Sequence, residues 1–577
     1  MVDPSSEGPF DAQTDPVLYD AEAGAAQKGR PTSTTRAVAS AGLITIAAAL
    51  ISRLLGMGRE IAIAHNLGQN ALADVYKQAF MVPDILFILL SSGALVTVFM
   101  PVFTGYLEQG DEKRAWHFFS NVVTIVALVI CACVVAGEVF VHPLTRLLNP
   151  GWTENKLEWQ LLETARLTRI VLPTQFCFFV GSILISVQYA FKRFKLPSAG
   201  SMVYNAFIIA GGLSLSGANP ITRALGYPGG LGAAGFSWGA LVGAVVGNLV
   251  IQGIGVWRLG GRYRPVIDWN DPGLRTFGRL IVPIIFTLSL PLLDMQVNKL
   301  FATFLKEGSV ASLDYANRLM QLPLGILAQA SAVAIYPFIA TQAARNDMVS
   351  LRRSLNMAVR TITAMTVPAS ALLIVLAEPV VRLVYQHGKF TASDTRFTAS
   401  VLVCYSLGIA AWSAQTVLAR GFYALQDTKT PMITGTYVTG IFVLMNAALV
   451  GPFKDQGLAM STSIAATILA LWLFFRLQKR LGGMNGALIM RSFVKVCAAS
   501  AVMAVPVYLM RLGLSHWFTP TAIDSTTAMG TGAASAVVFL CAAFGIVLYV
   551  ILLWVMRAEE ARFFYDRLLA RKQTAQR

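Results

Sequence analysis

Charged residues interrupt the first strongly apolar stretch of the chain. The run Ser52-Arg53-Leu54-Leu55-Gly56-Met57-Gly58-Arg59-Glu60 lies between the apolar segments 38–51 and 61–64. An ionisable side chain inside a membrane-spanning helix costs about 2.5 to 3.5 kcal/mol on insertion scales, so such residues are retained mainly where they line a polar cavity or contact a charged ligand. We therefore predict that this run forms the wall of a substrate cavity.

Helical geometry predicts which residues of the run face that cavity. Arg53, Gly56 and Glu60 share one stripe of a helix, and Arg59 flanks it. The glycines at 56 and 58 would leave room above the backbone for a bulky ligand. Several guanidinium groups together favour a multivalent anion such as a pyrophosphate, which arginine binds through paired hydrogen bonds. The structural alternative is an arginine that reaches the lipid headgroups or forms a clamp with Glu60.

The composition indicates a protein that crosses a membrane many times. The chain has 577 residues, of which 55% are hydrophobic and 13% charged, and its mean hydropathy is +0.60. A single soluble core could not bury so much apolar length. About fourteen apolar runs reach the length that a helix needs to cross the hydrocarbon, the first of them over 38–65. The sequence therefore predicts an all-α, polytopic membrane protein.

Basic residues predict how the chain is oriented. An even number of spans places both termini on one side, and the segments on that side hold about twice as many lysines and arginines as the opposite loops and helix ends, where Lys77 is assigned. The termini are therefore predicted to be cytoplasmic, with a disordered tail over 1–36 and a second tail over 557–577. Topology then explains the net charge of +16, and no nucleic-acid partner is required.

Short motifs of the first half recur in the second half at nearly constant spacing. The matched pairs are Asp74 with Asp314, Pro101 with Pro337, and Tyr189 with Tyr423, at offsets of 240, 236 and 234. We expect two pseudo-symmetric six-helix lobes, over 37–260 and 275–480, followed by two further helices over 490–556. The offset spans an even number of helices, so the lobes run parallel, as in transporters whose halves rock about a shared midplane site.

Both lobes are predicted to contribute to one binding site. Arg53 and Arg59 belong to the first lobe, whereas Arg318 belongs to the second. The predicted substrate-binding residues are Ser52, Arg53, Arg59, Glu60, Asn317 and Arg318.

Further motifs follow the first run in a fixed order. They are Leu67-Gly68, Asp74, Pro83, Gly93-Ala94, Phe99-Met100-Pro101, Gly308-Ser309-Val310, Tyr315-Ala316-Asn317-Arg318-Leu319-Met320, Pro323-Leu324-Gly325, Gly388-Lys389-Phe390-Thr391 and Phe422-Tyr423-Ala424-Leu425-Gln426-Asp427-Thr428-Lys429-Thr430-Pro431. Together these motifs resemble the MurJ/MviN lipid II flippases of the MOP exporter superfamily, from about residue 38 to the end.

The resemblance implies a fourteen-helix, MATE-like fold in the bacterial cytoplasmic membrane. It implies that the chain carries the undecaprenyl-pyrophosphate-linked peptidoglycan precursor, lipid II, from the inner to the outer leaflet. Arginines matching Arg53, Arg59 and Arg318 would face the diphosphate and sugar headgroup, and the last two helices would form a groove for the lipid tail. The expected partners are this precursor and membrane lipids, and we expect a monomer.

The resemblance also implies a cation site, which this sequence matches only in part. Some members are thought to bind sodium through acidic and amide side chains, and the matching candidates here are Asp294, Asn298 and Asn446. Formal charge has been lost relative to that pattern, although hard cations prefer carboxylate and carbonyl oxygens. No cofactor is expected, and coupling to Na⁺ or to the membrane potential stays open. The structural alternative is that Asp294 is a buried acid paired with Lys299.

Three residues are candidates for a gate. They are Asp74, Asp427 and Lys429. The last two lie in a tight turn before Pro431, where capping of the next helix is an equally good explanation.

Two other classes of function remain as alternatives. Another exporter of the same superfamily, either a multidrug/cation antiporter or a polysaccharide-lipid flippase, would share the fold. A membrane-embedded glycosyl or phosphoglycosyl transferase would need carboxylates or a metal at the membrane face. The histidines and cysteines show no metal-ligand spacing, so a transporter is predicted rather than an enzyme.

Overall fold

The computed structural model describes residues 51–90, 92–289, 294–518 and 531–556. The two predicted tails, 1–36 and 557–577, lie outside these ranges, as does the beginning of the first predicted span. Within the ranges the secondary structure is helical, and no strand occurs. The predicted all-α class is therefore confirmed for the part of the chain that can be described.

The first lobe begins with the helical residues 51–67. Its further helices are α3 (Ala71–Ala79), α4 (Met81–Leu90), α5 (Ser92–Glu108), α6 (Glu112–Val139), α7 (Val141–Leu148), α8 (Pro150–Glu154), α9 (Glu158–Val171), α10 (Thr174–Ala190), α11 (Lys195–Leu215), α12 (Pro220–Ala224), α13 (Ala233–Ala244), η3 (Val245–Val250) and α14 (Ile251–Trp257).

The remaining helices belong to the second half of the sequence. They are α15 (Pro272–Ser289), α16 (Asp294–Ala302), α17 (Ser309–Pro323), η5 (Leu324–Ala328), α18 (Gln329–Ala344), α19 (Met348–Val375), α20 (Ala377–Tyr385), α21 (Ala392–Ser406), α22 (Ile409–Ala424), α23 (Lys429–Arg480), α24 (Gly486–Phe518) and α25 (Thr531–Val555).

The predicted internal repeat is visible in the order and placement of the helices. Helices α6, α7, α9, α10 and α11 begin 236, 236, 234, 235 and 234 residues before α19, α20, α21, α22 and α23. Helices α6 and α19 each have 28 residues, and each is capped by an aspartate, Asp111 or Asp347, that accepts a hydrogen bond from a backbone N–H three residues later. The two halves are thus built from the same series of breaks and caps.

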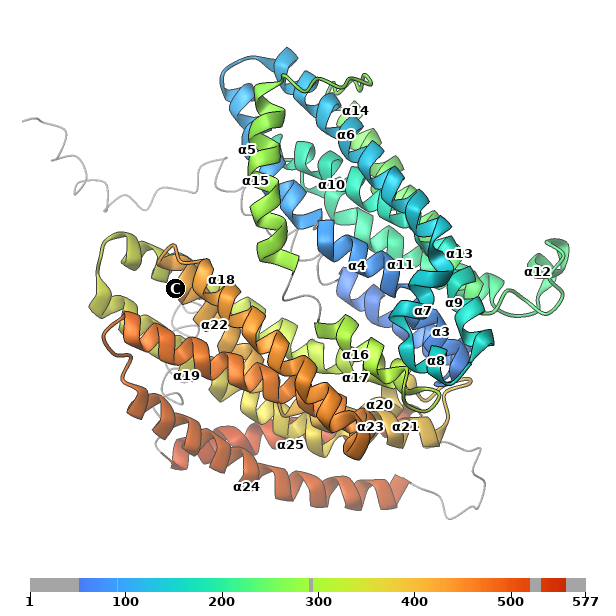
Figure 1. Cartoon of the computed structure of the whole chain (residues 1–577). Helices are drawn as coiled ribbons and strands as arrows, with labels where there is room; N and C mark the ends of the chain where they lie inside the picture. Colours follow the sequence, from blue (N-terminus) through green and yellow to red (C-terminus); the bar gives the residue numbers. More distant parts are fainter. Residues whose placement is uncertain (1–50, 91, 290–293, 519–530, 557–577) are drawn as a thin grey trace, which may run out of the picture.

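One helix does not follow the predicted division of the chain. Helix α15 opens the segment 275–480 predicted for the second lobe, but it packs against α5 and α4 of the first (Figure 1). Phe277 of α15 joins the aromatic cluster of that lobe, with its ring centroid 6.4 Å from that of Phe118. Burial of this apolar face accounts for the position of α15.

The number of membrane spans stays a prediction. Among the described residues, eight helices are long and apolar enough to cross a membrane, or up to ten if each of two bent pairs counts as one span. Helix α23 alone covers two predicted spans, 431–451 and 457–475, and breaks at Lys454, whose φ is +50°. A broken helix of this kind explains part of the difference from fourteen.

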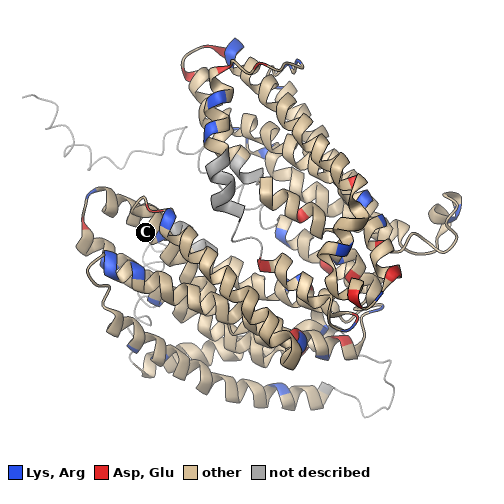
Figure 2. Ribbon diagram, viewed as in Figure 1, with Lys and Arg blue, Asp and Glu red and all other residues tan. Residues whose placement is uncertain are grey.

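The two lobes meet at one end and diverge toward the other (Figure 1). Helix α3 lies at the meeting end beside α17, while the connections α5–α6, α14–α15 and α18–α19 lie at the diverging ends. Lysines and arginines gather in these connections (Figure 2). The last two helices, α24 and α25, pack against α19 and α20 on the outer side of the second lobe.

Candidate functional site

A cavity of about 840 Å³ lies between the two lobes. The first lobe lines it with residues of segment 51–67, and the second lobe lines it with residues of α16, α17, η5, α22 and α23. Most of the predicted site residues meet here: Arg53, Arg59, Glu60, Asp294, Asn298, Asn317 and Arg318. Residues nearly 270 positions apart in the sequence therefore face one space.

The first run of the sequence forms one wall of this cavity, as predicted. A Cβ added at Gly56 would find no atom of the described chain within 4 Å, whereas one at Gly58 would meet Ile209 at 3.8 Å. Gly56 therefore leaves open space and Gly58 serves helix packing. Arg53 reaches across to η5, where a Cβ at Gly325 would come within 2.7 Å of its Nη1.

Ser52 does not line the cavity, in contrast to the prediction. Its hydroxyl donates to Ser201 Oγ of α11 at 3.0 Å. Consecutive residues of a helix point about 100° apart, so a residue next to Arg53 turns toward the neighbouring helix.

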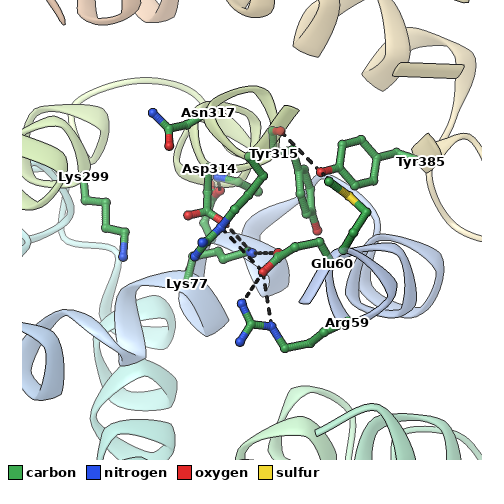
Figure 3. Close-up of polar contacts among 12 residues, drawn as sticks. Arg59, Glu60, Lys77, Lys299, Asp314, Tyr315, Asn317 and Tyr385 are labelled. Carbon is green, nitrogen blue, oxygen red and sulfur yellow. Dashed lines mark hydrogen bonds and ion pairs between the residues drawn. The ribbon is translucent and has the colours of Figure 1, made fainter. Parts of the chain in front are cut away.

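A network of buried charges joins the lobes beside the cavity (Figure 3). Arg59 Nη2 donates to Glu60 Oε1 at 2.6 Å, and Arg59 Nη1 donates to Asn205 Oδ1 at 3.2 Å. Lys77 of α3 lies between Glu60 and Asp314 and donates a hydrogen bond to each carboxylate. The distance from its Nζ to Asp314 Oδ2 is 2.5 Å. The clamp of Arg59 with Glu60 that the sequence left open is therefore present.

Arg318 completes this network from the second lobe. Its Nε lies 3.8 Å from Glu60 Oε1, and its side chain is 41% exposed. Glu60 is only 2% exposed. Three cations, Arg59, Lys77 and Arg318, thus share two carboxylates, which leaves an excess positive charge at the cavity wall.

Lys77 lies in the last turn of α3, at a helix end as the sequence suggested, but it is buried between the lobes. Lys77 is 6% exposed and its Nζ also lies 4.9 Å from the centroid of the Tyr315 ring. A buried ammonium group is stable only when paired. Helix α3 meets this requirement because it lies between the lobes, where Lys77 contacts acids from both.

Asp74 holds the lobes together at their meeting end. Its Oδ2 accepts from Gly308 N at 2.6 Å and its Oδ1 accepts from Ala311 N at 2.7 Å. Gly308, with φ +85°, has no side chain to cap α17, so Asp74 of the first lobe caps that helix. Tyr315 OH donates to Gly68 O at 3.2 Å beside it.

The other two gate candidates lie far from Asp74. Asp427 accepts from Thr430 N at 2.9 Å and from Thr430 Oγ1 at 2.7 Å, and it pairs with Arg480, so it caps the start of α23. Lys429 is exposed. The break of α23 at Lys454 adjoins the Asp74 end, because neighbouring Asp455 interacts with Ser309. The turn at Asp427 is therefore about 40 Å away along the helix.

The cation candidates form a network of amide and hydroxyl groups. Asn298 Nδ2 donates to Thr462 Oγ1 at 2.9 Å, and its Oδ1 accepts from Asn446 Nδ2 at 2.9 Å. Asp294 Oδ1 accepts from Thr439 Oγ1 at 3.2 Å. The Oδ1 of Asn446 is buried with no hydrogen-bond partner among the residues described. These groups provide a single carboxylate, and the amide oxygen of Asn298 is already hydrogen-bonded, so they fit a hard cation poorly.

Lys77, Asp314 and Tyr385 are the members of the site that sequence reasoning missed. Tyr385 OH donates to Tyr315 O at 3.4 Å, and the two rings lie 5.0 Å apart. The repeat held a usable signal, because it pairs α3 with α17. Helices related by a pseudo-twofold axis between lobes can meet at that axis. A charged residue one turn after Asp74 on α3, such as Lys77, would then face the equivalent helix α17, which carries Asp314.

Comparison with known proteins adds to this geometry. A sequence model of the family described as "Lipid II flippase MurJ" matches residues 63–524. A protein of Rhizobium meliloti (strain 1021), named "Probable lipid II flippase MurJ", is 28% identical over 509 residues, covering 86% of this chain and 92% of its own length. A Vibrio cholerae protein of the same name is 27% identical over 435 residues, covering 74% and 80%.

Solved structures share the fold. The structure titled "Lipid II flippase MurJ, inward closed conformation" has a TM-score of 0.71 and 23% identity, covering 91% of this chain and all of its own. An inward-facing multidrug resistance MATE family transporter of the MOP superfamily has a TM-score of 0.60 and 14% identity, covering 77% and 99%. Since the family model covers most of the sequence, this multi-pass membrane protein belongs to the MurJ family of lipid II flippases.

Proposed function

We propose that this chain carries lipid II from the inner to the outer leaflet of the bacterial cytoplasmic membrane by alternating access. The observation that carries this proposal is the cavity between the lobes, with Arg53 and Arg59 on one side and Arg318 on the other. A site made by both halves changes its access when one half rocks against the other. It is a transport function, without a catalytic step.

The diphosphate of the cargo is the group that this cavity suits. Arginine engages phosphate oxygens through two parallel N–H donors. Arg318 is partly exposed to the cavity, and Arg59 is held in place by Glu60 and Asn205. A bound diphosphate competes with Glu60 for these guanidinium groups. Its arrival thereby loosens the contact of Arg318 with the first lobe.

The basic loops suggest the direction of transport. Lysines and arginines gather at the diverging ends of the lobes (Figure 2), and such loops remain cytoplasmic. The cavity would then open to the cytoplasm, both termini would be cytoplasmic, and the end held by Asp74 would be the outer one. Asp74 acts there as a gate residue, whereas Asp427 and Lys429 belong to the cytoplasmic end.

Membrane potential is the coupling force that we favour. Outward movement of an anion is favoured by an inside-negative potential, by about 2.3 kcal/mol per charge per 100 mV. The alternative is coupling to sodium bound at Asp294, Asn298 and Asn446. We favour it less because few oxygen atoms of these side chains are free to ligate a cation. The chain is proposed to act as a monomer among membrane lipids, with the lipid tail against α24 and α25.

Complementation tests the proposal directly. The unaltered chain should restore growth and outer-leaflet precursor in a bacterium depleted of its own lipid II flippase. Arg59→Ala or Arg318→Ala should abolish that activity while membrane levels stay normal, because each removes a diphosphate ligand from one lobe. The matched control is Arg166→Ala, an exposed arginine paired with Glu163, which should remain active. Failure of the unaltered chain would favour another MOP exporter.

Filling the cavity is an independent test. Gly56→Phe places a ring where a Cβ would meet no described atom within 4 Å, so the protein should fold and transport should fall at least tenfold through lost cargo space. Gly56→Ala is the control, and it should keep transport and gain about 0.4 to 1 kcal/mol of stability. Full transport by Gly56→Phe would place the cargo elsewhere.

A further inference from the structure

A second cavity, of about 420 Å³, lies where the C-terminal helices meet the second lobe. We call it the α20/α24 pocket. Its lining includes Glu378 and Arg382 of α20, Arg511, Leu512 and His516 of α24, and Val537 of α25. It is separate from the cavity between the lobes, with which it shares no lining residue.

Two arginines in the α20/α24 pocket share one carboxylate. Arg511 Nη2 lies 2.8 Å from Glu378 Oε2, and Arg382 Nη2 lies 3.1 Å from Glu378 Oε1. Arg511 Nη1 also donates to Val375 O at 2.8 Å, which fixes its guanidinium group. The three side chains together carry one excess positive charge.

One donor of this group has no acceptor. The Nε of Arg382 is buried and lacks a hydrogen-bond partner within the described ranges. Buried polar groups are nearly always bonded, so an exception requires an explanation. Excess charge together with an unused guanidinium donor suits an anion with several oxygens, of which phosphate is the best geometric match.

The surroundings of the pocket suit a lipid. Exposed apolar residues follow one stripe of α24 toward the pocket: Val502, Val505, Leu509 and Leu512 are 56%, 60%, 60% and 44% exposed. Trp517, next to His516, is 86% exposed, and tryptophan is enriched at the membrane–water interface. The pocket is therefore at headgroup depth, with an acyl-chain path leading from it.

We propose that the α20/α24 pocket binds the phosphate headgroup of an anionic glycerophospholipid, whose acyl chains lie along α24. A volume of about 420 Å³ accepts a phosphoglycerol group and excludes a disaccharide–peptide headgroup, for which the larger cavity between the lobes is better suited. The lipid contacts α20 and α24 together, so it ties the C-terminal helix pair to the lobe.

The internal repeat supplies a matched control. Arg146 of α7 precedes Arg382 of α20 by 236 residues, the same offset as the two helices. Its side chain is 57% exposed and lies 3.2 Å from an equally exposed Glu158. Water solvates this arginine, and no described helix of the C-terminal pair covers it. Arg146→Gln therefore changes the same charge at the equivalent position without a pocket.

Lipid retention tests the proposal on the full-length protein. Purified protein is exchanged into nanodiscs of phosphatidylcholine with a rising fraction of phosphatidylglycerol, and the lipids that remain bound are counted by native mass spectrometry. Retention of phosphatidylglycerol should fall about fivefold for Arg382→Gln or for Arg511→Gln, as expected for one basic residue at an anionic headgroup. Arg146→Gln should retain as much as the unaltered protein. Equal retention by all three variants overturns the proposal.

A further variant separates binding from a merely structural role. Glu378→Gln removes the competing carboxylate, so phosphatidylglycerol retention should rise, whereas loss of retention would mean that the trio only holds helices together. Inorganic phosphate that displaces phosphatidylglycerol at equal concentration would overturn the assignment to a glycerophospholipid. None of these measurements depends on flipping, so their outcome is independent of the transport function proposed above.

Discussion

The two repeats place an aspartate at equivalent positions and surround it differently. Asp74 on α3 and Asp314 on α17 are 240 residues apart, and each follows a glycine turn, Gly68 with φ +75° and Gly308 with φ +85°. Asp74 accepts hydrogen bonds from backbone N–H groups of the other lobe, whereas Asp314 is paired with the ammonium group of Lys77. One acid closes an end of the molecule and the other belongs to the cavity wall.

This difference shows where the duplication stops. At the offset of 240, Lys77 of the first repeat corresponds to Asn317 of the second. In the same way, Arg318 of the second repeat corresponds to Gln78 of the first, which donates to Lys299 O at 2.9 Å. The two repeats share the same series of helices and turns, but neither Lys77 nor Arg318 has a cationic counterpart in the other repeat. The lobes therefore make one asymmetric site at their junction instead of two equal ones.

The largest effect is expected from the ammonium group that the second repeat lacks. Lys77→Met should destabilise the protein by about 3 to 5 kcal/mol, because it leaves Asp314 buried without its ammonium partner and Glu60 with only its arginine partners. Asn317→Met, at the equivalent position, removes only a neutral hydrogen bond with Gln321 and should cost about 1 kcal/mol. Thermal unfolding in detergent measures both. Equal losses would mean that the two positions are energetically alike.

A smaller effect is expected at the acid that closes the lobes. Asp74→Asn can keep one of the two backbone hydrogen bonds, so closure should weaken by about 1 to 3 kcal/mol. Ser309 is buried beside this contact. A Ser309→Cys thiol should therefore react faster with a membrane-impermeant maleimide when Asp74→Asn is also present.

The cap of α6 provides the control for that measurement. Asp111→Asn changes an exposed N-cap outside the contact between the lobes, so labelling at residue 309 should stay unchanged. Equal acceleration by Asp111→Asn would show that a general loss of stability, and not opening at Asp74, exposes the thiol.

Sequence alone predicted the frame of the molecule well. Hydrophobic length predicted spanning helices, and recurring motifs predicted the duplication that the starts of α6 and α19 display. The cost of intramembrane charge correctly pointed to segment 51–67 as a cavity wall. These features are encoded locally, in residue type and periodicity, so they can be read without knowing which helices touch.

Partners across the lobes could not be predicted from the sequence. Lys77 near a helix end looks like an ordinary interfacial residue until α17 supplies Asp314. Helix α15 has the same hydrophobicity wherever it packs, so its place against α5 depends on tertiary contacts. Ser52 directly precedes Arg53 in the sequence, but a single step along the helix turns it to Ser201.

The smallest effect is expected at the turns that begin α11 and α23. The first repeat has Arg193 where the second has Asp427, by the offset of 234 between these helices. Burial raises the pKa of Asp427, but hydrogen bonds from Thr430 and the charge of Arg480 outweigh it and hold that pKa below its usual value. The ionised carboxylate therefore stabilises the folded protein at neutral pH, and this contribution is lost as pH falls through the lowered pKa.

Asp427→Asn keeps an oxygen that can accept from Thr430 N but removes the charge paired with Arg480, so it should cost about 0.5 to 1 kcal/mol at neutral pH. In acid, once Asp427 is protonated in the unaltered protein, the difference between the two proteins should shrink. Arg193→Gln, at the equivalent turn, should change stability by less than about 0.5 kcal/mol at either pH. Thermal unfolding across pH makes the comparison. If the stability lost in Asp427→Asn were the same at every pH, packing of the turn, and not the charge on Asp427, would distinguish the second repeat from the first.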